Sequence, residues 1–115
     1  MPAEEHLRID VRHEGNRLVL RLAGELDLAT VSLLEGQIDE AGAQDAAMVV
    51  LDLEQLDFID STGLRAVLSA HATAVEREQE FAVTRGSEQV QRLLSLTHVA
   101  EHLRIVEPSA DRDSS

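Results

Sequence analysis

The spacing of apolar residues changes repeatedly along this chain of 115 residues, and that change is the feature that most limits its fold. Apolar and charged residues alternate over 7–12, and leucines recur at every second position over 18–22. A period of two is typical of a strand with one buried face. The linker at 13–16 is short and contains Gly15, so the two segments predict a β-hairpin.

The apolar spacing becomes helical in three later stretches, at residues 31–41, 64–75 and 88–94. Thr30 stands where an N-cap is expected for the first of these helices, and Gly42 stands where it would end. Ser87 is the expected cap of the third helix.

Short apolar runs predict the remaining strands, at residues 48–53, 81–83 and 103–106. The first run opens without alternation, as in a strand buried on both faces. Strands that are joined through helices run parallel, with right-handed crossovers. The order of elements therefore predicts an α/β fold with a mixed β-sheet, in which an N-terminal antiparallel hairpin precedes strands joined by helical crossovers.

The length fits a single domain. We expect the domain to occupy residues 7–107, after a flexible N-terminus at 1–6. The polar residues 108–115 are expected to form a disordered tail.

The formal net charge of −12 limits the classes of partner. Phosphate backbones and anionic membrane surfaces repel such a chain, so we expect no direct nucleic acid or membrane contact and a partner with a basic face.

The chain has no lysine, which excludes Schiff-base chemistry and a lysine-dependent phosphate loop. It has no cysteine, which excludes disulfides and thiolate catalysis. We also expect a cytoplasmic protein, because no signal peptide and no apolar run of about 20 residues is present.

Asp60-Ser61-Thr62-Gly63 lies between a strand-like segment and a strongly periodic helix. The free backbone N–H groups of a first helical turn, together with the helix dipole, favour negative charge. A phosphate on Ser61 could be held there, adding roughly −1.5 to −2 charges at one point. Gly63 would let a partner approach the backbone closely. The competing interpretation is a common helix cap, formed by Asp60 or Ser61.

Three stretches of the chain resemble a STAS domain, and specifically the bacterial anti-sigma factor antagonists. Residues 22–27, Leu-Ala-Gly-Glu-Leu-Asp, match a strand-end signature of that family. Residues 49–53 with Phe58 and Ile59 match its central strand, and residues 60–64, Asp-Ser-Thr-Gly-Leu, match its phosphorylation motif at every position. The resemblance covers roughly residues 7–107, although the lysines common in that family are absent here.

The resemblance implies a mixed sheet with helices mainly on one face, and a binding module in place of an enzyme. Ser61 matches the serine that an anti-sigma factor with ATP-dependent serine-kinase activity phosphorylates. Asp60 matches an acidic neighbour needed for recognition, and Thr62 matches a position that is sometimes a second acceptor. The unphosphorylated form binds the anti-sigma factor and frees a sigma factor, whereas phosphorylation causes release. A metal-dependent phosphatase of the PP2C type then restores the first state.

The expected contact surface combines the Ser61 junction with the loop from Gly24 to Thr30, because open α/β sheets bind at the carboxyl ends of their strands. Its residues are Asp60, Ser61, Thr62, Gly63, Leu64, Gly24, Glu25, Asp27 and Thr30. We expect no cofactor, no metal and a monomer when the protein is free.

Other functions remain open on the sequence alone. A STAS adaptor without phosphorylation, a scaffold in a stress-signalling or lipid-transport complex, is the alternative of a different class. The spacing of His98, Glu101 and His102 matches a zinc pattern, but it falls where a turn is expected. A hydrolase that uses Ser61 and His71 is not favoured, because the segment lacks the first glycine of a nucleophile elbow. A metal site at Asp57 is not favoured either, because this aspartate is expected to be a solvated loop residue.

Overall fold

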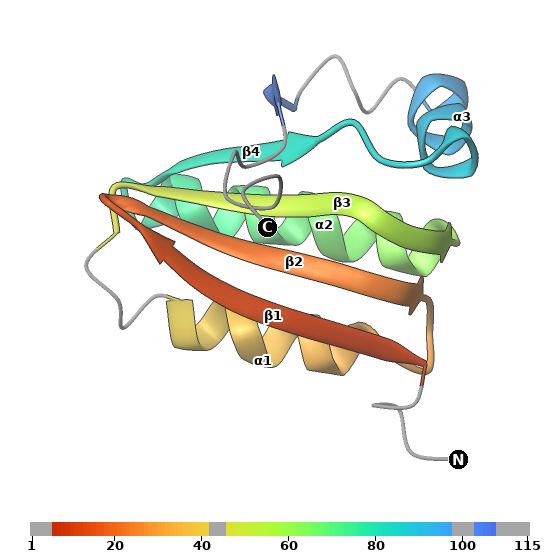
Figure 1. Ribbon diagram of the computed structural model, residues 1–115, viewed down its shortest axis with the longest axis horizontal. Coiled ribbons are helices and arrows are strands. Elements are labelled where there is room, and N and C mark those ends of the chain that lie inside the picture. Colours follow the sequence, from red (N-terminus) through yellow and green to blue (C-terminus); the bar gives the residue numbers. More distant parts are fainter. Residues whose placement is uncertain (1–5, 42–45, 98–102, 108–115) are drawn as a thin grey trace, which may run out of the picture.

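Five strands form one mixed sheet in the part of the chain that the computed structural model describes, residues 6–41, 46–97 and 103–107. The elements in chain order are β1 (Leu7–Glu14), β2 (Arg17–Leu26), α1 (Val31–Ala41), β3 (Met48–Ile59), α2 (Ser61–Glu76), β4 (Glu80–Thr84), α3 (Glu88–Leu96) and β5 (Ile105–Val106). The strands lie in the order β1-β2-β3-β4-β5 (Figure 1). β1 and β2 pair antiparallel, and the other pairs are parallel. This architecture confirms the predicted fold class and order of elements.

The helices pack on one face of the sheet. Figure 1 shows α1 and α2 behind the strands, on the same side. Residues from all three helices share one apolar core with alternate residues of the strands, such as Leu20, Leu22 and Leu51. A smaller apolar cluster on the opposite face contains strand residues alone: Val19, Met48, Val50 and Ala82, with Val106 against it. Two-residue periodicity therefore assigned Leu7, Leu18, Leu20 and Leu22 to the correct face, whereas Val11, in the same alternation in β1, is 44% exposed.

β3 is longer than the sequence predicted, because it continues past residue 53 to Ile59. Its pairing with β2 shifts by one additional β3 residue at two points, between Arg21 and Ala23 and between Gly24 and Glu25 of β2. Such bulges interrupt the alternation of side chains on which strand prediction depends. The shifts return Ile59 to the apolar core beside Leu26.

Two other boundaries differ from the prediction. The helix expected from residue 64 begins at Ser61, because Asp60 provides its N-cap. The last strand contains Ile105 and Val106 only, although Leu103 is buried before it. The expected stop at Gly42, the predicted tail at 108–115 and residues 1–5 of the predicted N-terminus at 1–6 lie outside the described residues.

Side chains replace the missing strand along the second half of β3. β4 pairs with β3 only as far as Leu51. Beyond that point the N–H of Leu53 donates to the Thr84 hydroxyl at 2.7 Å, and the N–H of Gly86 donates to the Glu54 carboxylate at 3.2 Å. The Gln89 side chain accepts from the N–H of Ile59 at 3.1 Å and donates to its carbonyl oxygen at 3.3 Å. The edge that leads to Asp60 is thereby hydrogen-bonded without a neighbouring strand.

Thr84 has no solvent exposure and joins β4 to the buried carboxylate of Asp52, to which its hydroxyl donates at 3.3 Å. We predict that Thr84→Val lowers the free energy of unfolding by about 1–3 kcal/mol, because the N–H of Leu53 and the Asp52 carboxylate both lose a buried partner. Urea unfolding measures this. Thr84→Ser keeps the hydroxyl and is expected to lose less stability; a larger loss for Thr84→Ser than for Thr84→Val would contradict the assignment.

Candidate functional site

Ser61 lies where two parallel strands end together. β2 and β3 finish side by side, with Leu26 opposite Ile59, and the N–H of Asp60 donates to the carbonyl oxygen of Leu26 at 3.3 Å. The loop that follows β2 and the turn that begins α2 therefore lie at the same edge of the sheet. The structure brings together the two segments that the sequence assigned to one contact surface.

Asp60 is the N-cap of α2. Its backbone is extended, with φ −109° and ψ −174°, and its side-chain Oδ1 accepts from the N–H of Gly63 at 2.9 Å. An aspartate in this position satisfies one of the free donors of the first turn and places negative charge at the positive end of the helix dipole. The cap interpretation is thus correct for Asp60.

Ser61 is the first residue of α2 and is exposed. Its hydroxyl forms no hydrogen bond with another described residue, because the capping role belongs to Asp60. The hydroxyl can therefore be reached by another protein without any change in the fold. Thr62, the neighbouring hydroxyl, is half-buried.

Gly63 is buried, and its lack of a side chain serves the fold directly. A Cβ at this position would collide with the carbonyl oxygen of Leu26, and would lie 2.9 Å from the Ile59 side chain. The close approach that the sequence suggested is therefore made by β2 of the same chain and not by a partner. Leu64 is also buried, so these two residues shape the junction from beneath the surface.

The loop from Asp27 to Thr30 is held by its own side chains. The Thr30 hydroxyl donates to the carbonyl oxygen of Glu25 at 2.9 Å and accepts from the N–H of Asp27 at 3.0 Å. The Asp27 carboxylate accepts from the N–H of Ala29 at 3.0 Å. Thr30 was expected to cap α1, but its buried hydroxyl faces back into the loop and fixes the loop beside the Ser61 junction.

Gly24 allows the start of β1 to pair closely with the end of β2 at this edge of the sheet. Its φ is +110°, a region that side chains rarely adopt, and a Cβ would collide with the carbonyl oxygen of His6. That same oxygen accepts from the N–H of Glu25 at 2.8 Å, and the Glu25 side chain is exposed.

Two exposed apolar side chains beside the junction were not included in the contact surface predicted from the sequence. Leu28 is 76% exposed in the loop, and Phe58 is 41% exposed at the end of β3, opposite Glu25. Acidic side chains accompany them, at Glu25 and Asp57. The sequence held one local indication that Leu28 is exposed: it follows Asp27 outside any periodic segment, where no core contact is expected.

The other candidate sites are either structural or beyond the described residues. The His71 ring packs on Phe81, with ring centroids 5.5 Å apart, as expected for a histidine at the edge of the core. The His98–His102 pattern lies outside the described residues. Among the residues with described positions, no three His, Asp or Glu side chains gather in a way that could hold a metal ion. No helix in these ranges is long and apolar enough to cross a bilayer.

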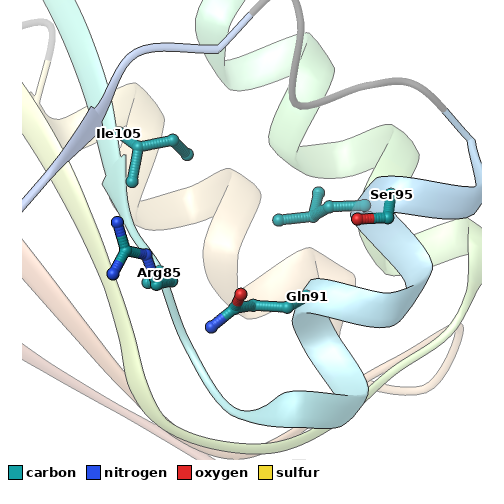
Figure 2. Close-up of a pocket in the computed structure, with 5 residues that line it drawn as sticks. Arg85, Gln91, Ser95 and Ile105 are labelled. Carbon is teal, nitrogen blue, oxygen red and sulfur yellow. The ribbon is translucent and has the colours of Figure 1, made fainter.

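A groove of about 150 Å³ lies between α3 and β5 (Figure 2). Its described lining residues are Arg85, Gln91, Leu94, Ser95 and Ile105. None of them belongs to the predicted contact surface.

Comparisons with known proteins agree with this geometry. The sequence profile of the STAS domain matches residues 8–111. The anti-sigma F factor antagonist of Paenibacillus polymyxa is 34% identical over 93 residues, which are 80% of this chain and 80% of that protein. The anti-sigma-F factor antagonist RsfB of Mycobacterium tuberculosis is 33% identical, over 76% of this chain and 71% of its own length.

The same fold occurs in a solved structure of an anti-sigma factor antagonist from Mycobacterium paratuberculosis. The TM-score is 0.81 at 23% identity, and the match covers 97% of this chain and 94% of the other. Since the STAS profile spans nearly all described residues and curated relatives exceed 30% identity, the chain belongs to the STAS domain family.

Proposed function

We propose that this protein is an anti-sigma factor antagonist that works by partner switching. In its unphosphorylated form it binds an anti-sigma factor with serine-kinase activity and thereby frees a sigma factor. Phosphorylation of Ser61 causes release, and a PP2C-type phosphatase reverses it. The names of the curated relatives support the role of antagonist, and they describe regulatory proteins and not enzymes.

The accessibility of Ser61 is the observation that carries the proposal. A kinase substrate needs a free hydroxyl, and a binding surface needs a constant shape. Ser61 provides the first, because Asp60 caps the helix in its place. The second follows from the hydrogen bonds of Asp60 to Leu26 and of Gln89 to Ile59. This exposed acceptor favours the switch over an adaptor that is never phosphorylated.

The chemistry of the surface supports a protein partner with basic and apolar groups. Leu28 and Phe58 offer exposed apolar contacts beside the acidic side chains of Glu25 and Asp57. Apolar anchors surrounded by charge are common at protein interfaces, and charge complementarity accelerates association. The buried Gly63, Leu64 and Thr30 contribute to such a contact by holding the backbone, whereas Asp60, Ser61, Glu25 and Asp27 are available to touch the partner.

We predict that the cognate anti-sigma factor, incubated with ATP, places phosphate on Ser61 and then releases this protein. Peptide mass spectrometry locates the phosphate, and size-exclusion chromatography follows the complex. Ser61→Ala is expected to stay bound after ATP is added. Ser69→Ala, which alters another exposed serine of α2, is expected to behave like the wild type.

Two results would contradict the proposal. One is phosphate on another residue together with normal release of Ser61→Ala. The other is a stable complex that ATP never dissociates, which would favour the adaptor.

We further predict that Leu28→Ser weakens binding to the unmodified partner by about tenfold or more, because a buried interface leucine contributes roughly 1.5 kcal/mol or more. Leu96→Ser is the matched control, since Leu96 on α3 is 72% exposed against 76% for Leu28. Surface plasmon resonance measures both affinities. Equal effects of the two substitutions would remove Leu28 from the contact surface.

A further inference from the structure

The exposed face of α2 carries one arginine, Arg65, one helical turn after Ser61. Along the first three turns of this helix, the exposed side chains are Ser61, Arg65 and Ser69. The residues between them are mainly buried or half-buried against the core: Thr62, Gly63, Leu64, Ala66, Val67 and Leu68. The three exposed side chains therefore form a single stripe, each one turn from the next.

Arg65 forms no hydrogen bond or ion pair with any described residue. The positions one turn away on α2 are Ser61, Thr62, Leu68 and Ser69, and none of them is acidic. Glu35 and Asp39 of α1 line the groove between the two helices, beside Ala66 and Ser69, and they too leave the Arg65 guanidinium unpaired. The unmodified helix thus presents a free cation.

The geometry of an α-helix directs this cation toward Ser61. Side chains four residues apart have Cβ atoms about 5–6 Å apart. Helical side chains also lean toward the N-terminus, so a side chain as long as that of arginine can reach the turn that begins at Ser61. An anion placed one turn before a cation is the favourable order for such a pair.

We propose that Arg65 is the counter-ion of phosphorylated Ser61, an inference that rests on the proposed phosphorylation of that serine. A phosphate beside a basic partner would, if left unpaired, attract the partner's cations. Pairing with Arg65 weakens that attraction. The ion pair thereby helps phosphorylation to cause release.

The first test needs this chain alone. Phosphoserine is incorporated at position 61 during translation, and the second ionisation of the phosphate is followed by ³¹P NMR. Compared with Arg65→Gln, the wild type is expected to show a phosphate pKa lower by about 0.3, as an exposed pair of about 0.4 kcal/mol implies. Arg65→Lys keeps the charge and is expected to restore most of the shift, and high salt is expected to reduce it.

The control is Arg17→Gln, which removes a positive charge from the first residue of β2. That strand is ten residues long and reaches the Ser61 junction with its last residue, so Arg17 lies about 30 Å away at about 3.3 Å per residue. The carboxylates that can oppose the phosphate are Asp60 at the cap, Glu25 and Asp27 at the end of β2 and in its loop, Asp57 in β3, and Glu35 and Asp39 on α1. They are present in every variant. Arg17→Gln is expected to leave the phosphate pKa as it is in the wild type. If Arg65→Gln changes the phosphate pKa no more than Arg17→Gln does, the proposal is wrong.

The second test measures release. The ratio of the partner's Kd for the phosphorylated protein to its Kd for the unmodified protein is expected to fall about twofold in Arg65→Gln, in keeping with the size of the pair. An unchanged ratio would show that the pair has no part in release. If wild-type phosphoserine protein binds as tightly as unmodified protein, the proposed function fails, but the NMR titration still decides whether Arg65 pairs with the phosphate.

Discussion

The parallel pairing of β2 with β3 is the interaction on which the rest of the site depends. It ends with Leu26 opposite Ile59, and the carbonyl oxygen of Leu26 then accepts from Asp60 and lies directly against Gly63. Any side chain on Gly63 would push α2 away from the strand that supports it. The position of Ser61 in space is therefore set by backbone contacts within the sheet, and not by contacts of the serine itself.

The second half of β3 has no strand on its β4 side, yet it must hold the start of α2. Thr84 and Gln89 supply hydrogen bonds to its backbone that a neighbouring strand would have made, and the Glu54 carboxylate of β3 itself accepts from the N–H of Gly86. Side chains can bond a bulged strand at irregular intervals, whereas a second strand would require regular register. A strand that bends twice can in this way remain ordered up to its last residue.

The charge distribution suits a reversible contact. The protein carries a net charge of −12, and carboxylates of the loop and the cap flank the exposed hydroxyl. The charged side chains of α2 are Arg65 in its second turn and Glu76 at its last residue, and the His71 ring packs against Phe81. A small covalent change at Ser61 therefore acts on a local balance of charge, and it does so at a point where the backbone is already held by the sheet.

The sequence alone determined the order of elements, the buried face of Leu18, Leu20 and Leu22, and the motif around Ser61, because these depend on residue type and on periods of two and 3.6 residues. Its expectations at Thr30 and Gly63 were different from what the structure shows: the Thr30 hydroxyl bonds to Glu25, and Gly63 makes room for Leu26. The bulges in β3 and the exposure of Leu28 and Phe58 were also decided only by the tertiary structure. The bulges and the close approach at Gly63 depend on contacts between residues distant in the chain, and no local pattern records which distant residue arrives.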